Sequence, residues 1–313
     1  MSELEKNTSS RSRKFDADQR TLIDTETIIK ALEQHNYLAD EELATALFLL
    51  IRLGKPMLLE GPPGIGKTEL AVVLAKLLQT KLIRLQCYEG LDINTAVYEW
   101  NYQKQLLGIK LFENSDLSIK QKEHDIFGED YLLKRPLLQS ITEPDFPPVL
   151  LIDEIDRSDE EFEAFLLELL STFQISIPEM GTIKAIHRPF VILTSNRTRE
   201  LSDALKRRCL YQWIDYPDLE KELSIIRKKL PNIEEKLLHQ VVNCVQNFRK
   251  LKLLKTPGVS ETVDWAESLM ALGYREVNAQ AFKRTLGSVL KTTDDIERMK
   301  LEDVESLNSK TKA

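Results

Sequence analysis

The amino-acid sequence predicts an α/β domain, in which helices flank a parallel sheet, followed by a smaller all-helical domain. Short apolar runs alternate with helix-forming segments up to Pro217, an order typical of parallel sheets. A glycine-rich turn follows the first of these runs, and amphipathic helices alone follow Pro217. We expect four parts: a disordered segment 1–20, an α/β domain 21–217, a helical lid 218–301 and a disordered tail 302–313.

Composition and charge are those of an ordinary globular protein. The 313 residues are 42% hydrophobic and 30% charged. The net charge of -7 argues against general electrostatic binding of nucleic acid. The first twenty residues lack the apolar segment of a signal peptide, and no run approaches the ~18 apolar residues of a membrane span. Cys87, Cys209 and Cys244 form no metal-binding pair, so we expect buried thiols in a reducing, cytoplasmic compartment.

The apolar runs have the length and composition of buried parallel strands. They comprise residues 56–60, 82–87, 149–152 and 190–194. Helices are expected at 39–53, where Gly54 ends the helix, and at 67–78. The long stretch 88–148 is expected to be mostly helical with a loop, and insertions of this size tend to be functional or disordered. The lid helices are expected at residues 219–230, 235–249, 260–272 and 279–290.

The turn after the first strand matches the phosphate-binding pattern G-x-x-x-x-G-K-[ST] in full. Its glycines let the backbone approach phosphate oxygens where a side chain would collide. Because Pro62 and Pro63 lack an N–H, the donors to phosphate must come from Gly64 onward. Lys67 is placed to pair with the β- and γ-phosphates, and the Thr68 hydroxyl is placed to bind Mg²⁺. The residues expected to bind the nucleotide are Gly61, Pro62, Pro63, Gly64, Ile65, Gly66, Lys67, Thr68 and Glu69.

The third strand ends in two adjacent carboxylates. Asp153 is placed to hold the metal ion together with Thr68, and Glu154 to polarise a water for attack on the γ-phosphate. Such a pair can also be a solvated loop, but the phosphate-binding turn upstream favours the catalytic interpretation. For the helix that follows, we expect a capping box between Ser158 and Glu161.

Two further positions are candidates for catalysis. Asn196 follows the fourth strand, where its side chain is expected to hydrogen-bond the attacking water or the γ-phosphate, the alternative being a turn residue. Arg207 and Arg208 end a short helix and suit an arginine finger that enters a neighbouring subunit's site. Basic residues at a helix C-terminus are otherwise expected from the helix dipole. We favour Arg208 as the finger, so the expected catalytic residues are Lys67, Glu154, Asn196 and Arg208.

These elements, in this order, resemble the Walker A, Walker B, sensor 1 and arginine-finger set of AAA+ P-loop NTPases. Within that group the chain resembles the MoxR family from about residue 39 to 290. The resemblance is carried by 153–168, which includes Walker B, and by 175–185, which has the pattern of a β-hairpin turning at Gly181. It implies an AAA+ sheet domain with a C-terminal helical lid.

Two segments, 98–102 and 257–265, are more similar to one MoxR branch, which includes the ATPase that matures the molybdenum–copper centre of carbon monoxide dehydrogenase. The resemblance implies ATP and Mg²⁺ as cofactors, a homo-oligomeric and typically hexameric ring, and remodelling of a client protein. It also implies a partner carrying a von Willebrand factor A domain. One position departs from the AAA+ pattern: residues 260–262 stand where a sensor 2 arginine is common, although Lys255 nearby can substitute.

The sequence also bears on two alternative functions and contains three smaller features. A nucleic-acid-remodelling motor, such as a helicase loader or a restriction-type translocase, predicts a basic hairpin, whereas 175–185 offers only Lys184 against Glu179. A scaffold without hydrolysis is disfavoured by the adjacent carboxylates. The aromatic pair Trp100 and Tyr102 is expected to pack in a core rather than grip a substrate. The four histidines have no metal-ligand spacing, and the basic alternation at 250–255 is expected to be a solvated lid face.

Overall fold

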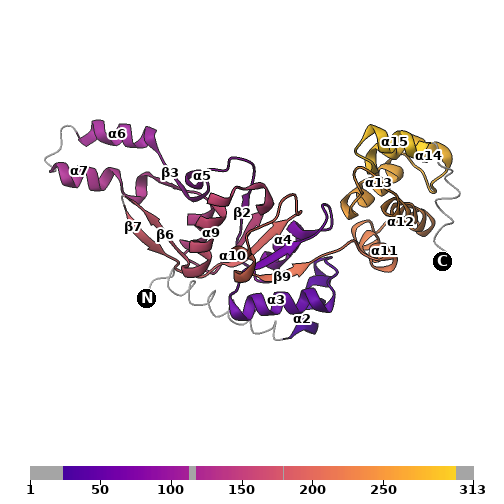
Figure 1. The fold of residues 1–313 in the computed structure, drawn as a ribbon, viewed down its shortest axis with the longest axis horizontal. Coiled ribbons are helices and arrows are strands. Elements are labelled where there is room, and N and C mark those ends of the chain that lie inside the picture. Colours follow the sequence, from indigo (N-terminus) through magenta and orange to yellow (C-terminus); the bar gives the residue numbers. More distant parts are fainter. Residues whose placement is uncertain (1–23, 113–117, 179, 301–313) are drawn as a thin grey trace. The chain divides into compact units, whose positions relative to one another are not determined.

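The computed structural model describes residues 24–112, 118–178 and 180–300 (Figure 1). The predicted disordered ends, 1–20 and 302–313, lie outside the described residues. The chain divides into two compact units. Of the described residues, those within 24–31, 40–60 and 68–212 form unit 1, and those within 32–39, 61–67 and 213–300 form unit 2.

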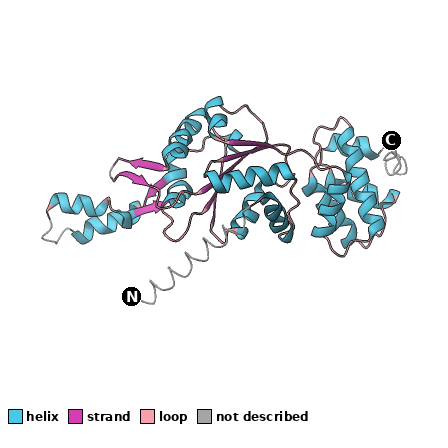
Figure 2. Ribbon diagram, turned by 90° about the horizontal axis from the view of Figure 1, so that it is seen from below, coloured by secondary structure: helices cyan, strands magenta, loops and turns pink. Residues whose placement is uncertain are grey.

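A five-stranded sheet with the order β2-β5-β8-β1-β9 forms the centre of unit 1. Its strands are β1 (Met57–Glu60), β2 (Leu82–Gln86), β5 (Val149–Asp153), β8 (Phe190–Ser195) and β9 (Leu210–Trp213). The pairs β2–β5, β5–β8 and β8–β1 are parallel, and helices lie on both sides of the sheet (Figure 2). The first four strands confirm the prediction. The fifth was not predicted, because the sequence Leu-Tyr-Gln-Trp contains no apolar run. In the structure this strand is only partly buried.

The helices of the sheet domain are α2 (Thr25–Gln34), α3 (Glu41–Leu53), α4 (Lys67–Leu77), α9 (Glu160–Thr172) and α10 (Asp203–Arg208). The helices predicted at 39–53 and 67–78 are confirmed as α3 and α4, with ends that differ by at most two residues. Asp40 caps α3 by accepting the Leu43 N–H at 2.9 Å. Gly54 ends the same helix in the left-handed region, with φ of +62°. This confirms the predicted C-terminal stop at a glycine.

The predicted capping box at the start of α9 is wrong. The N-cap is Asp159, whose carboxylate accepts the Phe162 N–H at 2.8 Å. Ser158 instead donates its hydroxyl to the Ile155 carbonyl at 2.8 Å. Ser158 therefore caps the C-terminal end of a short 3₁₀ turn, η2 (Ile155–Arg157). The helix begins one residue later than the sequence pattern indicates.

An insertion separates β2 from β5 and carries two helices outward from the sheet (Figure 1). Its elements are α5 (Ile93–Val97), β3 (Tyr98–Trp100), α6 (Tyr102–Phe112), α7 (Ile119–Ile126), η1 (Glu129–Tyr131), β4 (Leu132–Lys134) and α8 (Pro136–Ile141). The strands β3 and β4 pair antiparallel at the base of the α6/α7 arm. The prediction of a mostly helical insertion is confirmed. The two-stranded ribbon was not predicted, because strands of three residues are too short to show a period.

The aromatic pair of the insertion separates into one core residue and one surface residue. Trp100 is buried and meets Phe127 edge-to-face, with ring centroids 5.4 Å apart. Tyr102 is 66% exposed. The expectation of core packing is therefore confirmed for Trp100 and wrong for Tyr102, because α6 begins at Tyr102 and leads away from the ribbon.

The predicted hairpin precedes β8. It is formed by β6 (Gln174–Ile177) and β7 (Gly181–Lys184), which pair antiparallel. Gly181 adopts φ of +81°, a conformation that favours glycine at the end of the turn. Glu179, which the charge argument for this hairpin included, lies outside the described residues.

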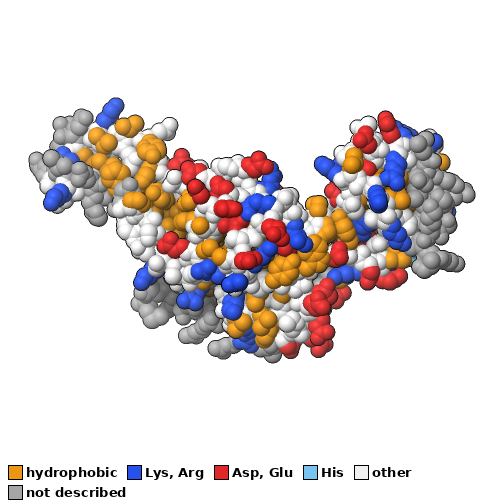
Figure 3. All heavy atoms as spheres, viewed as in Figure 1, with side chains coloured by type: hydrophobic (Ala, Val, Ile, Leu, Met, Phe, Trp, Pro, Cys, Tyr) orange, Lys and Arg blue, Asp and Glu red, His pale blue; other side chains and the backbone are white. Residues whose placement is uncertain are grey.

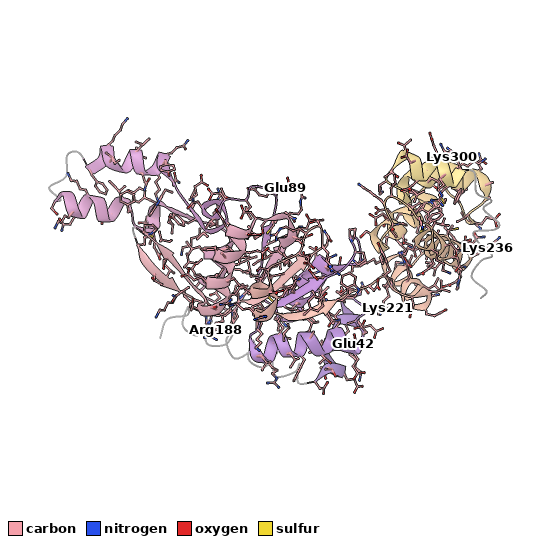
Figure 4. The ribbon with its side chains drawn as sticks, viewed as in Figure 1. Glu42, Glu89, Arg188, Lys221, Lys236 and Lys300 are labelled. Atoms are coloured by element: carbon pink, nitrogen blue, oxygen red, sulfur yellow. The ribbon has the colours of Figure 1, made fainter. Side chains whose placement is uncertain are left out.

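The helices of unit 2 surround their own aromatic core. They are α11 (Leu219–Lys229), α12 (Glu235–Lys250), α13 (Val259–Ala271), α14 (Ala279–Val289) and α15 (Thr293–Lys300). Phe248, Trp265 and Phe282 contact one another with ring centroids 5.9 to 6.2 Å apart. Lys236, labelled in Figure 4, pairs with Glu276 on the surface of this unit. Among the helices of the described residues, none has both the length and the apolar character needed to cross a bilayer.

Candidate nucleotide-binding site

The glycine-rich turn connects β1 to α4 and has a backbone that only glycines adopt easily. Gly61, Gly64 and Gly66 have φ of +157°, +74° and +95°. A Cβ on Gly61 would lie 2.0 Å from the Ile214 carbonyl oxygen, so no other residue fits there without movement of the backbone. This curled loop leaves its N–H groups from Gly64 onward as the candidate phosphate donors.

The Lys67 side chain is 6% exposed and is held across the loop. Its ammonium donates to the carbonyl oxygens of Gly61 at 2.7 Å and Pro62 at 2.6 Å. A lysine ammonium is a point charge with three donors, so these two bonds position the charge inside the loop.

The start of α13 contacts the same loop. The main-chain N–H of Ser260 donates to the Gly64 carbonyl at 3.1 Å, and the Ser260 hydroxyl donates to the same oxygen at 3.3 Å. Residues 260–262, the predicted sensor 2 position, thus supply a hydroxyl beside the loop instead of an arginine. The Lys255 side chain is exposed, and its main-chain N–H bonds to Asp295.

An aromatic ring that was not predicted from the sequence also lies by the loop. A Cβ placed on Gly66 would lie 3.7 Å from Cε2 of Tyr37, which precedes α3. A single tyrosine between two helices has no sequence pattern that would identify it.

Three side chains contact the carboxylate of Asp153, the last residue of β5. The Thr68 hydroxyl at the start of α4 lies 3.0 and 3.2 Å from the two carboxylate oxygens. The Thr194 hydroxyl donates to Oδ1 at 2.5 Å, and Arg84 Nη2 donates to Oδ2 at 2.6 Å. Asp153 is only 3% exposed, so these bonds satisfy a buried carboxylate. The Thr68 and Asp153 oxygens are the type of ligand that Mg²⁺ prefers.

Glu154 turns the chain sharply after the strand. Its φ of +55° lies in the left-handed region, which costs a non-glycine residue ~1 kcal/mol. The turn is held by its main-chain N–H, which donates to the Thr194 hydroxyl at 2.9 Å. The Glu154 carboxylate is one-third exposed and pairs with Arg157 at 3.2 Å. The carboxylate therefore stands at the surface, beside the buried Asp153.

Asn196 lies in the loop that follows β8. Its main-chain N–H donates to Asp156 Oδ2 at 3.2 Å, and the same oxygen accepts the Thr198 hydroxyl at 2.6 Å. Asp156 is 2% exposed, so a buried carboxylate holds this loop. The side chain on this strand that contacts Asp153 is that of Thr194. The role expected for the Asn196 side chain stays a prediction.

Arg84, Thr194 and Asp156 are residues of the site that were not predicted from the sequence. Strand register could have found Thr194, because Leu193 pairs with Ile152 and thereby brings Thr194 beside Asp153. Arg84 has no local signal, since its contact depends on β2 lying next to β5 in the sheet order.

Both finger candidates lie at the end of α10 with exposed side chains. Arg208 Nε donates to the Ser171 hydroxyl near the end of α9, at 2.8 Å. The choice between Arg207 and Arg208 stays a prediction.

The parallel sheet, its strand order and the glycine-rich loop after β1 define the fold of an AAA+ P-loop NTPase. The profile of the "ATPase family associated with various cellular activities (AAA)" matches residues 57–214, and the chain belongs to this family.

The chain is similar to staphylococcal proteins whose names state no activity. An uncharacterised protein of Staphylococcus haemolyticus (strain JCSC1435) is 25% identical over 279 residues, which cover 86% of this chain and 97% of that protein. One from Staphylococcus aureus (strain bovine RF122 / ET3-1) is 27% identical over 229 residues, covering 71% and 78%.

Solved structures of RuvB from Thermotoga maritima are also similar. A mutant has a TM-score of 0.48 and 20% identity, with coverage of 85% of this chain and 73% of its own. The structure described as the RuvB Holliday junction branch migration motor has a TM-score of 0.43 and 18% identity, with coverage of 87% and 68%.

Proposed function

We propose that the protein binds ATP with Mg²⁺ and hydrolyses it, and that it acts as a MoxR-type ATPase in a homo-oligomeric, hexameric ring. The observation that carries this proposal is the contact between the Thr68 hydroxyl, which directly follows the phosphate-binding loop, and the buried carboxylate of Asp153. This contact joins the two parts of the chain that a P-loop enzyme needs for binding phosphate and metal.

The nucleotide would be held by Gly61, Pro62, Pro63, Gly64, Ile65, Gly66, Lys67, Thr68 and Glu69. The N–H groups from Gly64 onward bind phosphate oxygens, and Lys67 supplies positive charge to them. Thr68 and Asp153 hold the metal ion. Mg²⁺, when bound, neutralises charge on the phosphates and orients them for in-line attack.

Glu154 is the proposed general base. Its one-third exposed carboxylate can accept a proton from a water, while its main-chain N–H stays anchored to Thr194. Asn196 is proposed to hydrogen-bond that water or the γ-phosphate. Arg208 is proposed to enter the site of a neighbouring copy, where it stabilises charge in the transition state, so hydrolysis requires assembly.

Hydrolysis is proposed to drive the remodelling of a client protein during the maturation of a metalloenzyme or a protein complex. The protein is proposed to act together with a partner that carries a von Willebrand factor A domain. The MoxR-like segments at 153–168 and 175–185 support this proposal, and so does the exposed apolar surface of the α6/α7 arm. The net charge of -7 favours a protein client over nucleic acid.

The test is the ATPase rate per subunit at increasing protein concentration, for the wild type, Glu154→Gln and Arg208→Ala, with Arg207→Ala as the matched control. We expect the wild-type rate to rise with assembly. Glu154→Gln should bind a fluorescent ATP analogue normally but turn over ATP at least ~100-fold more slowly. Arg208→Ala should lose ~10³-fold in turnover, while Arg207→Ala keeps its rate.

Each contrary result has a defined meaning. If the wild type binds ATP but does not hydrolyse it at any concentration, the isolated protein is not an ATPase. If Arg207→Ala loses activity and Arg208→Ala does not, Arg207 is the finger. A rate per subunit that is independent of concentration would contradict the shared site.

A further inference from the structure

The edge strand β2 brings an arginine to the Asp153 carboxylate. Along this strand Ile83 and Leu85 are buried, whereas Arg84 and Gln86 are exposed on the opposite face. In the parallel register Gln86 stands opposite Asp153. Arg84 Nη2 lies 2.6 Å from Asp153 Oδ2 and 2.7 Å from Gln86 Oε1, so the two acceptors share one guanidinium nitrogen.

The two partners of this ion pair differ greatly in exposure. The Asp153 side chain is 4% exposed, and the Arg84 side chain is 52% exposed. A buried carboxylate is costly without a positive counter-charge, which Arg84 provides here. A Mg²⁺ ion held by Asp153 would provide the same counter-charge, and two cations at one carboxylate repel each other.

We propose that Arg84 is a positioning residue that competes with Mg²⁺ for the Asp153 carboxylate, so that it stabilises the metal-free site and sets the Mg²⁺ concentration needed for nucleotide binding. This proposal rests on the proposed function. Binding of the metal ion then requires Arg84 to withdraw from Asp153 Oδ2.

Gln86 gives the displaced guanidinium a second acceptor. Its carbonyl oxygen already accepts from the same Nη2 atom, and the exposed Arg84 side chain can take its other hydrogen bonds from water. Thr68 and Thr194 donate neutral hydroxyls to Asp153 and bring no competing charge. Arg84 therefore brings a positive charge directly to this carboxylate.

The test measures binding of a fluorescent ATP analogue while Mg²⁺ is titrated, for the wild type and Arg84→Gln. We expect the half-saturating Mg²⁺ concentration to fall ~2- to 5-fold in Arg84→Gln, the range of an ion pair with one exposed partner. In EDTA without nucleotide, the melting temperature of Arg84→Gln should be lower than that of the wild type, and the difference should shrink with Mg²⁺ and ATP. Gln86→Ala should raise the Mg²⁺ requirement, because the guanidinium then loses its alternative acceptor.

The matched control is Arg135→Gln, which removes the surface pair with Glu99, where the two side chains are 45% and 46% exposed. It should leave the Mg²⁺ requirement unchanged. Arg84→Lys keeps the charge and should stay near the wild type. If Arg84→Gln does not fold, Gln86→Ala tests the competition, because its Mg²⁺ requirement should rise and an unchanged requirement would contradict the proposal.

Other results would overturn the proposal in distinguishable ways. An unchanged Mg²⁺ requirement in Arg84→Gln, with normal nucleotide binding, refutes the competition and leaves the proposed function intact. A higher requirement means that Arg84 orients Asp153 for the metal ion. If the wild type binds no ATP analogue with or without Mg²⁺, the proposed function is wrong and this inference falls with it.

Discussion

Thr194 connects the two acidic residues of the site through a single hydroxyl. That hydroxyl donates to Asp153 Oδ1 and accepts the main-chain N–H of Glu154. It therefore holds the carboxylate proposed to bind Mg²⁺ and the backbone of the proposed general base in one arrangement. Because Thr194 is 1% exposed, water has little access to replace the hydroxyl if it is removed.

We predict that Thr194→Val lowers ATP turnover at least ~10-fold and reduces the free energy of unfolding by ~1 to 3 kcal/mol, because a buried donor and acceptor lose their partner. Steady-state ATPase assays and urea denaturation measure the two effects. Thr182→Val on the exposed strand β7 is the control, and it should change neither quantity appreciably. Unaltered turnover in Thr194→Val would contradict the positioning role.

Among the elements, helix α6 has its apolar side chains on the solvent side. The buried positions are Gln105 and Gly108, where a Cβ on Gly108 would lie 2.4 Å from the Tyr131 hydroxyl. The exposed apolar residues are Tyr102 (66%), Leu106 (63%), Leu107 (58%), Ile109 (44%) and Leu111 (70%). Figure 3 shows hydrophobic side chains gathered on the arm. Contiguous apolar surface of this kind marks interaction sites in soluble proteins.

We predict that the double variant Leu106→Ser, Leu107→Ser binds less of a hydrophobic fluorescent dye than the wild type and keeps the wild-type melting temperature. The reason is that both leucine side chains remain largely exposed to water in the folded protein, so their replacement removes little buried apolar surface. Leu137→Ser in α8, a fully buried position, is the contrast and should lower the melting temperature sharply. A large loss of stability in the double variant would show that α6 is packed in solution.

In the lid, one buried ion pair joins three helices. Glu222 of α11 is fully buried and accepts from Arg249 of α12 at 2.6 and 2.8 Å and from the Thr262 hydroxyl of α13 at 2.8 Å. Arg249 also lies over the Tyr216 ring, 4.7 Å from its centroid. The cost of removing one partner is high, because the other charge is left buried.

We therefore predict that Glu222→Ala destabilises the lid by ~3 to 5 kcal/mol. Urea denaturation followed by circular dichroism measures the loss. Glu235→Ala, which removes a surface pair with Arg227, is the control and should leave the transition midpoint close to that of the wild type. Equal effects of the two variants would argue against a structural role for the buried pair.

On the scale of the whole molecule, folding buries the thiols of Cys87 and Cys244 and partly covers that of Cys209. Burial raises the pKa of Cys87, Cys209 and Cys244 to about 12 in each case. At pH 8 the thiolate fraction in the folded protein is then on the order of 10⁻⁴. We predict that no thiol reacts rapidly with a disulfide reagent at pH 8, and that all three react once guanidinium unfolds the chain. A rapid reaction of one equivalent in the native protein would contradict this.

The same raised pKa values set the sign of an alkaline pH effect. Between the ordinary thiol pKa of 9.0 and about 12, the unfolded chain loses thiol protons that the folded chain keeps. Ionisation therefore favours the unfolded state, and stability that is fully present below pH 9 should decline as the pH rises toward 12. Urea midpoints at pH 8 and pH 10.5, with Cys244→Ala as the comparison, measure the contribution of one thiol.

Local patterns were sufficient to predict the first four strands, the phosphate-binding loop and the positions of Asp153 and Glu154. Each depends on neighbours within a few residues: an apolar run, glycines that permit a curled backbone, or a carboxylate at a strand end. Helix caps are less well determined, because Ser158 and Asp159 both have capping side chains, and the short 3₁₀ turn η2 that ends at Ser158 decided between them.

The remaining features depended on contacts between distant parts of the chain. Arg84 and Thr194 reach Asp153 only because β2 and β8 lie on either side of β5 in the sheet. The exposure of Tyr102 and the outward leucines of α6 likewise follow from the direction in which the β3–β4 ribbon carries the helix. Residue type and spacing carry no information on which strand lies beside which, because pairing between strands is set by the free energy of packing the whole domain.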